Sequence, residues 1–130
     1  MIKSRPTATP DAIEAARAAA AAIDDKNGED ILLLDLSSLL VVTDVFVVAS
    51  GTSNRHVRTL VEEAEEALKA LGRRPLRREG VDHGEWVLID YGDVVIHVFD
   101  RPTRAYYELE RLWADAPMID FERSPSNIDA

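Results

Sequence analysis

Apolar residues recur at helical spacing along one stretch in the middle of the chain, residues 57–71. The stripe consists of Val57, Leu60, Val61, Ala64, Leu68 and Leu71. Charged residues fill the opposite side and include pairs four residues apart, such as Arg58 and Glu62. Ser53 is a suitable N-cap, and Gly72 is a suitable residue just beyond the C-terminus. The pattern predicts an amphipathic helix that buries its apolar stripe.

The same period predicts a helix near each end of the chain. Near the N-terminus, Thr9 is an N-cap, Pro10 takes the first helical position, and the helix ends near Asn27 and Gly28. Its apolar positions are Ile13, Ala16, Ala20 and Ile23. Near the C-terminus, residues 103–116 (TRAYYELERLWADA) predict one continuous helix. We expect its inward face to consist of Ala105, Leu109 and Leu112.

Shorter apolar runs, rich in β-branched residues, predict strands. ILLLDL (31–36) and VFVVAS (45–50) are typical of buried strands. PLRREG (75–80) is open to two interpretations. It is either an edge strand, which its proline and arginines would protect from pairing, or a solvated basic loop.

A two-residue turn signal, Gly92-Asp93, separates two further apolar runs, residues 86–91 and 94–99. A hairpin with this loop has one apolar face, formed by Val87, Ile89, Tyr91, Val94, Ile96 and Val98. On its other face, Trp86 lies opposite Phe99, Leu88 opposite His97, and Asp90 opposite Val95. The apolar face predicts core. The mixed face is either covered by the C-terminal helix or offered to a partner.

The predicted elements follow the order α-β-β-α-β-β-β-α. This order predicts the α/β fold class, as a single layered domain with a mixed five-stranded sheet and flanking helices. We expect the domain to span residues 1–116. Residues 117–130 contain two prolines and little periodicity, and we expect them to form a mobile tail.

Charge and composition narrow the classes of partner. The net charge of −9 disfavours general binding to a nucleic acid backbone and favours a basic protein. The absence of cysteine excludes disulfides, thiolate metal sites and a cysteine nucleophile. The chain begins without an apolar signal segment, and Asp35 and Asp44 interrupt its most apolar stretch. We therefore expect no signal peptide, no membrane span and a cytoplasmic location.

A glycine, two hydroxyl side chains and a histidine meet at residues 49–57 (ASGTSNRHV), where a predicted strand leads into a helix. A helix N-terminus in this position can hold phosphate, so a nucleotide-binding enzyme or sensor is one hypothesis. Nucleotidyltransferases begin similarly, but two carboxylates spaced two apart on the next strand hold their magnesium. The nearest candidates, Asp90 and Asp93, are three apart and lie across a turn.

Catalysis and metal binding have weaker support. Ser53 and His56 are close in sequence, but Ser53 is expected to cap the helix. His56, His83 and His97 belong to three separate elements without metal-ligand spacing. We expect no catalytic residue, no metal site and no cofactor. We interpret the segment as a turn that leaves Arg55 and His56 as surface contacts.

Three ordered blocks resemble a known family. They are TDVFVVASGTSNRHV, WVLIDYGDVVIHVF and YYELERLW. They are similar to the ribosomal silencing factor RsfS, the Iojap family, over roughly residues 11–115. The resemblance implies a fold related to nucleotidyltransferases without their catalytic carboxylates, and a protein that is not an enzyme. It also implies binding to large-subunit ribosomal protein fourteen, which blocks subunit joining when nutrients are scarce.

The resemblance assigns partner-binding residues as well. By motif, the docking aromatics of the family correspond to Trp86 and Tyr107, with Glu108 beside the latter. Because the inward face of the predicted helix is apolar, Tyr107, Glu108, Glu110 and Arg111 cannot all be buried. We therefore include Glu110 and Arg111 in the partner-binding set.

Two further interactions are compatible with this assignment: a homodimer of the free protein and a minor contact with ribosomal RNA. The basic patch GRRPLRREG and the tail lie outside the shared blocks, so their roles stay open.

Overall fold

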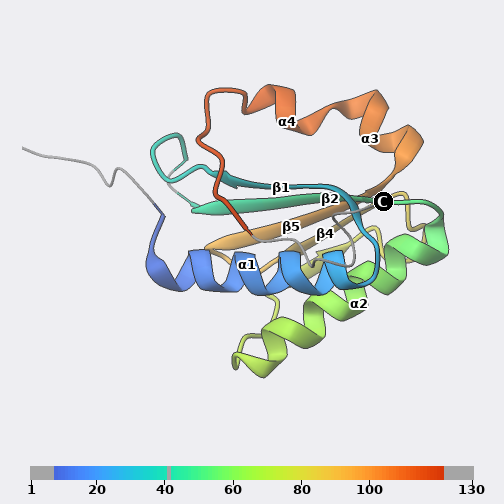
Figure 1. Cartoon of the computed structure of the whole chain (residues 1–130), viewed down its shortest axis with the longest axis horizontal. Helices are drawn as coiled ribbons and strands as arrows, with labels where there is room; N and C mark the ends of the chain where they lie inside the picture. Colours follow the sequence, from blue (N-terminus) through green and yellow to red (C-terminus); the bar gives the residue numbers. More distant parts are fainter. Residues whose placement is uncertain (1–7, 41, 122–130) are drawn as a thin grey trace, which may run out of the picture.

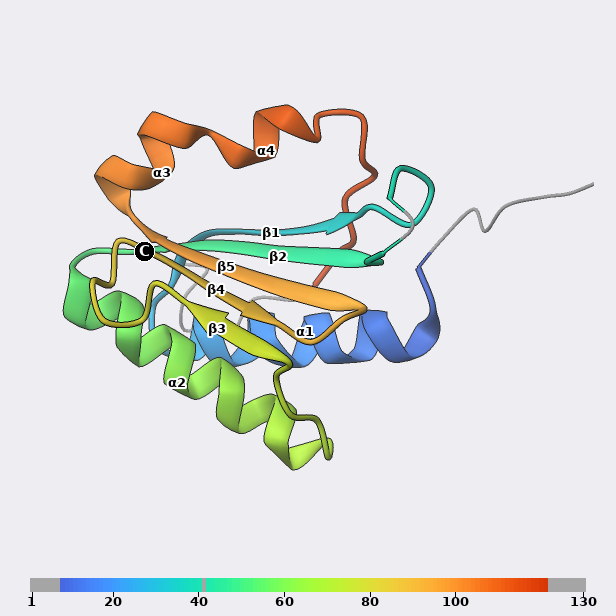
Figure 2. The same cartoon turned by 180° about the vertical axis from the view of Figure 1, so that it is seen from behind.

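The computed structural model describes residues 8–40 and 42–121, which form three layers (Figure 1). A five-stranded sheet lies between two helical layers (Figures 1 and 2). The helices on one face are α1 (Pro10–Asp25) and α2 (Asn54–Ala70), and those on the other are α3 (Arg101–Tyr107) and α4 (Leu109–Leu112). The predicted fold class, an α/β domain with flanking helices, is confirmed.

The sheet is mixed, as predicted. Its strands are β1 (Glu29–Asp35), β2 (Val45–Gly51), β3 (Arg77–Glu79), β4 (Trp86–Asp90) and β5 (Val94–Asp100). Their order is β1-β2-β5-β4-β3, with β2 and β5 parallel and the other neighbours antiparallel. Because β3 is an edge strand, the structure decides the open alternative for residues 75–80 in favour of a strand.

Local signals begin and end the long helices. The Thr9 hydroxyl accepts from the backbone N–H of Ala12 at 3.2 Å, and the Ser53 hydroxyl accepts from that of His56 at 3.0 Å. Gly72, just beyond α2, has a φ of +80°, which glycine adopts without steric cost. The predicted stripe of α2 is buried up to Leu68. Leu71 is instead exposed, because it lies at the C-cap after the last helical turn.

Among the described residues, no helix combines the length and the apolar character that a membrane span requires.

The hairpin has the predicted register. Val87 pairs with Val98 and Ile89 with Ile96, and the face that they share is buried in the core beneath α1 and α2. Gly92 opens the loop with a φ of +92°, a conformation that favours glycine.

A second, smaller core lies on the other face of the sheet, under α3 and α4. Its buried members are Leu34, Leu36, Val48, Phe99, Leu109 and Ala116, with Phe46, Trp86 and Trp113 partly buried around them. His97 lies on this face and is only 3% exposed. Burial lowers the pKa of His97 from 6.5 to about 4, and the carboxylate of Asp90 opposes this shift to a smaller extent.

The prediction of one continuous helix over residues 103–116 is wrong. α3 begins earlier, where the Asp100 carboxylate accepts from the N–H of Thr103 at 2.9 Å. It ends before Glu108, whose φ of +48° is left-handed, and α4 is a separate short helix. The inward face differs as well: Leu109 is buried, but Ala105 and Leu112 are exposed.

The buried side chain of Arg104 explains the break. Its guanidinium donates to the Ser50 hydroxyl on β2 at 2.8 Å and to the Glu110 carboxylate at 3.2 Å. Residues six apart on a straight helix point to different sides, because each residue turns the helix by about 100°. The left-handed residue Glu108 brings Glu110 back toward Arg104.

The predicted tail, residues 117–130, begins with residues that pair with the sheet. The carbonyl of Pro117 accepts from Asp35 N–H at 2.8 Å, and the N–H of Ile119 donates to the Leu33 carbonyl at 2.8 Å. Ile119 and Phe121 also pack against the main core. Residues 122–130 lie outside the described residues, and the domain boundary at 116 stays a prediction.

Replacing Arg104 by methionine should destabilise the fold. The substitution removes the donor that the buried Ser50 hydroxyl and Glu110 share, and we expect the free energy of unfolding to fall by about 1–3 kcal/mol. Urea denaturation measures this change. The control is Arg101→Met, which breaks the exposed ion pair with Glu29 and should shift the midpoint far less. Equal effects of the two substitutions would contradict the role of Arg104.

The low pKa of His97 predicts a pH dependence of stability. Between pH 6.5 and about 4, the unfolded chain binds a proton at this residue and the folded chain does not. The free energy of unfolding should therefore fall by up to about 3 kcal/mol as the pH falls through this window. Denaturation at several pH values should show that the free energy of unfolding falls less with decreasing pH in His97→Phe than in the wild type. Part of the fall should remain in both proteins, because their carboxylates also titrate. The same slope in both would contradict the prediction.

Candidate functional site

Trp86 and Tyr107 meet at the border of α3 and the sheet. Trp86 opens β4 and is partly buried, with its ring stacked on Phe99 at a centroid distance of 4.8 Å. Tyr107 is the last residue of α3 and is 52% exposed. Its ring contacts the indole of Trp86 at a centroid distance of 4.9 Å. Two aromatic side chains that are far apart in sequence thus converge on one accessible spot.

Further apolar surface lies beside this pair. Tyr106 is 80% exposed and makes an edge contact with Tyr107 at 4.9 Å. Leu88, on the same face of β4 as Trp86, is half-buried and helps to line a shallow hollow of about 290 Å³. Tyr106 was not among the predicted site residues, although it directly precedes Tyr107 in the sequence. We call Trp86, Leu88, Tyr106 and Tyr107 the aromatic patch.

His97 holds the indole of Trp86 from beneath. The indole N–H donates to Nδ1 of His97 at 3.1 Å, and the imidazole packs against Phe46 at a centroid distance of 4.5 Å. Because Nδ1 accepts, the neutral ring carries its proton on Nε2. Nε2 is buried and has no hydrogen-bond partner among the described residues. The sequence pattern placed His97 on the mixed face of the hairpin but did not predict this bond.

The charged residues of the predicted set have separate roles. Glu108 and Arg111 form an exposed ion pair at 2.8 Å, next to Tyr107. Glu110 is less exposed, and its carboxylate is engaged by Arg104. The structure thus gives Glu110 an internal partner, whereas Glu108 and Arg111 remain accessible.

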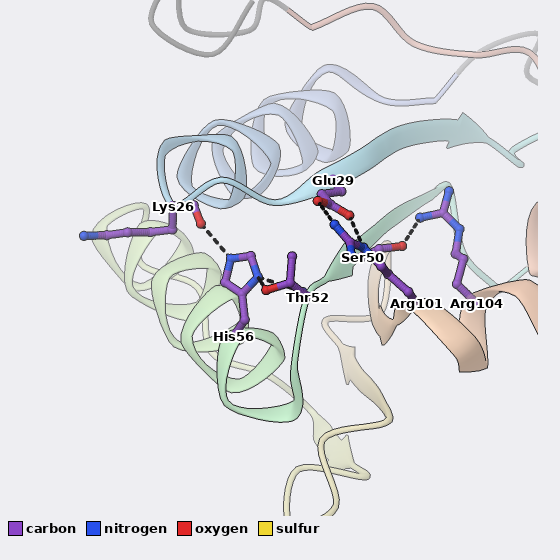
Figure 3. Close-up of polar contacts among 7 residues, drawn as sticks. All are labelled: Lys26, Glu29, Ser50, Thr52, His56, Arg101 and Arg104. Atoms are coloured by element: carbon purple, nitrogen blue, oxygen red, sulfur yellow. Dashed lines mark hydrogen bonds and ion pairs between the residues drawn. The ribbon is translucent and has the colours of Figure 1, made fainter. Parts of the chain in front are cut away.

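The turn at residues 49–57 is built around His56 (Figure 3). The N–H of Thr52 donates to Nδ1 of His56 at 2.9 Å, and Nε2 lies 2.8 Å from the carbonyl of Lys26. His56 therefore ties the start of α2 to the end of α1, and both of its ring nitrogens are engaged within the molecule. Arg55 is exposed. Whether either residue is a surface contact stays a prediction.

Packing and capping account for the glycine and hydroxyls of this turn. A Cβ on Gly51 would lie 3.0 Å from both the backbone nitrogen and a side-chain carbon of Val57, so glycine allows β2 and α2 to approach closely. The N–H of Thr52 is taken by His56, and the Ser53 hydroxyl caps the helix. Among the described residues, no group of three or more His, Cys, Asp or Glu side chains could hold a metal ion.

The basic patch GRRPLRREG is largely neutralised within the molecule. Arg73 pairs with Asp93 at 2.7 Å, and Arg78 pairs with Glu65 at 2.7 Å. Arg77 bridges to Glu79 at 2.6 Å. Arg77 also pairs with Asp90 on β4 at 3.2 Å. The pairs of Arg73 and Arg78 and this contact of Arg77 join β3 and the loop before it to neighbouring elements, so these arginines have a structural role.

Comparisons with known proteins agree on one family. A family model described as ribosomal silencing factor during starvation, RsfS, matches residues 9–130. The ribosomal silencing factor RsfS of Bacillus subtilis (strain 168) is 44% identical over 104 residues, which make up 80% of this chain and 88% of that protein.

Two solved structures are similar in fold and sequence. A crystal structure of a Chromobacterium violaceum protein matches with a TM-score of 0.75 and 42% identity, over 78% of this chain and 84% of that one. A crystal structure of a Bacillus halodurans protein matches with a TM-score of 0.72 and 36% identity, over 82% of this chain and 97% of that one. The resemblance seen in the sequence is therefore confirmed, and the chain belongs to the ribosomal silencing factor family.

Proposed function

We propose that this protein is a cytoplasmic, non-enzymatic silencing factor that binds the large ribosomal subunit through ribosomal protein fourteen. While bound, it occupies the face at which the small subunit docks and so represses translation when nutrients are limited. The observation that carries the proposal is the convergence of Trp86 and Tyr107, 4.9 Å apart, on an accessible border of the sheet.

The aromatic patch has the properties of an interface core. Aromatic side chains bury a large area and lose few rotamers on binding, because each has only two side-chain torsions. Trp86 and Tyr107 are already held against Phe99 and against each other, so little order must be gained on docking. Such pre-organised anchors are typical of residues that dominate binding energy.

The charge of the protein supports a basic partner. A net charge of −9 attracts a lysine- and arginine-rich ribosomal protein and is repelled by most of the surrounding RNA phosphate. Glu108 and Arg111, exposed next to Tyr107, are suited to set the register of docking. Glu110 supports the site through Arg104 and is a weaker candidate for direct contact.

The proposed mechanism is steric. A standard interface of about 800 Å² on each partner is large enough to hold a small protein at one position. Occupancy of that position prevents the small subunit from joining, and no bond needs to be made or broken. A homodimer of the free protein through the aromatic patch, and a minor contact with ribosomal RNA, are secondary proposals. A dimer of this kind would have to open before the ribosome is bound.

Truncating the aromatic anchors should abolish silencing. We expect Tyr107→Ala and Trp86→Ala to weaken binding to purified large subunits about thirtyfold or more, because anchor residues at interface centres commonly cost at least about 2 kcal/mol on truncation. Sucrose-gradient sedimentation of mixed subunits should show that wild-type protein lowers the fraction of joined ribosomes. Both variants should restore that fraction.

The matched control is Leu76→Ala, which removes an exposed apolar side chain from the loop before β3. It should silence as the wild type does. If wild-type protein leaves subunit joining unchanged, the proposed function is wrong. If it blocks joining but Tyr107→Ala blocks it equally well, the docking site lies elsewhere.

A further inference from the structure

We infer that His97 is a positioning residue, whose imidazole fixes the indole of Trp86 in the orientation that the partner meets. The inference rests on the proposed function, because it gives a role in docking to a side chain that the partner cannot reach. His97 is 3% exposed and lies on β5, beneath the aromatic patch.

Stacking alone does not determine how the indole lies. The torsion that turns the ring of tryptophan about its Cβ–Cγ bond has broad minima. A ring turned over would still stack on Phe99 but would point its N–H away from His97. The hydrogen bond from Nε1 to Nδ1, 3.1 Å long, distinguishes the two orientations. It therefore determines which edge of the indole lies next to Tyr107 and solvent.

The acceptor is itself held rigidly. β5 is an interior strand, and His97 pairs with Val48 on β2 and with Leu88 on β4. Phe46 packs against its ring. The lowered pKa of His97, about 4, keeps the ring neutral near pH 7, so the lone pair of Nδ1 stays available to the indole.

The stability of the fold does not explain why residue 97 is a histidine. The tautomer that accepts at Nδ1 buries an N–H at Nε2, which finds no partner among the described residues. A buried donor without a partner destabilises the folded state. An apolar ring of similar size would avoid this cost and would leave unpaired only the N–H of the partly buried indole. Phenylalanine should therefore pack at least as well among Phe46, Phe99 and Trp86. Phenylalanine, however, cannot accept a hydrogen bond from the indole N–H.

The test uses two variants of the full chain that separate packing from the hydrogen bond. His97→Phe keeps a ring but removes the acceptor. His97→Asn removes much of the ring but places Oδ1 close to the position of Nδ1. Thermal unfolding measures stability, and binding to purified large subunits measures docking.

We expect stability and docking to move in opposite directions. His97→Phe should melt at or above the temperature of the wild type, yet bind large subunits three- to tenfold more weakly, the loss of about one hydrogen bond. His97→Asn should melt lower but bind within about twofold of the wild type. A purely structural role of His97 would make binding follow stability in both variants, which would overturn the inference.

A spectroscopic measurement tests the bond without the ribosome. In a ¹⁵N–¹H spectrum, the protein should give one indole N–H signal for Trp86 and one for Trp113, and Trp113→Phe assigns them. The indole N–H of Trp86 should exchange its hydrogen with solvent at least fivefold faster in His97→Phe than in the wild type. An unchanged signal and exchange rate would show that His97 does not hold the indole.

A double-mutant cycle with Trp86→Phe separates this inference from the proposed function. Trp86→Phe lacks the indole N–H, so adding His97→Phe should weaken binding no further, whereas independent effects would multiply. If the two substitutions weaken binding by factors that multiply, the inference is overturned, but the proposed docking site is not. If Trp86→Ala binds as tightly as the wild type, the proposed docking residue fails, and the inference fails with it.

Discussion

The buried guanidinium of Arg104 determines where the helical layer of α3 and α4 lies on the sheet. These two helices are short, and within residues 101–116 the buried apolar side chains are those of Leu109 and Ala116. So little apolar burial cannot by itself fix the orientation of a helix. Arg104 supplies the missing constraint, because its bond to Ser50 fastens α3 to β2 and its bond to Glu110 fastens α4 to α3. The place of Tyr107 beside Trp86 depends on both bonds.

A short covering layer leaves part of a sheet face at the surface, and the aromatic patch lies along that border. Trp86 lies partly under this layer and partly outside it, since it stacks on buried Phe99 and also touches exposed Tyr107. The same ring thus closes the smaller core and supplies apolar surface. This double use explains why the mixed face of the hairpin satisfied both interpretations of its sequence pattern. It is covered along β5 and open at the start of β4.

Features that depend on neighbouring residues were predictable from the sequence. The caps Thr9 and Ser53, the stripe of α2 and the register of the hairpin all follow from spacings of a few residues. The break at Glu108 was not predictable, because it brings Glu110 to a guanidinium that points inward only through its bond to Ser50, 54 residues away. The period of the C-terminal segment gave no sign that a charged residue would point inward.

The candidate site was predictable in part. The aromatic pair came from the family motif, and the structure places its two members in contact. The bond between Trp86 and His97 has a signal in the register, since a residue on an antiparallel strand also lies diagonally near the residue two positions from its direct partner. Trp86 is opposite Phe99, so His97 is that diagonal neighbour. The pairing register predicts which side chains are neighbours, but it does not predict which of their atoms form a hydrogen bond.

The left-handed conformation of Glu108 connects the fold to the proposed docking. A non-glycine residue in this region costs roughly 1 kcal/mol, and here it lies directly after the docking tyrosine. The strain is offset by the ion pair that the break makes between Arg104 and Glu110 and by the burial of Leu109. An unbroken helix would carry Glu110 away from Arg104 and would lose the contact that fastens α4 to α3. The strained residue thus ends α3 at Tyr107, and the short helix leaves the ring half-exposed at its tip, against Trp86.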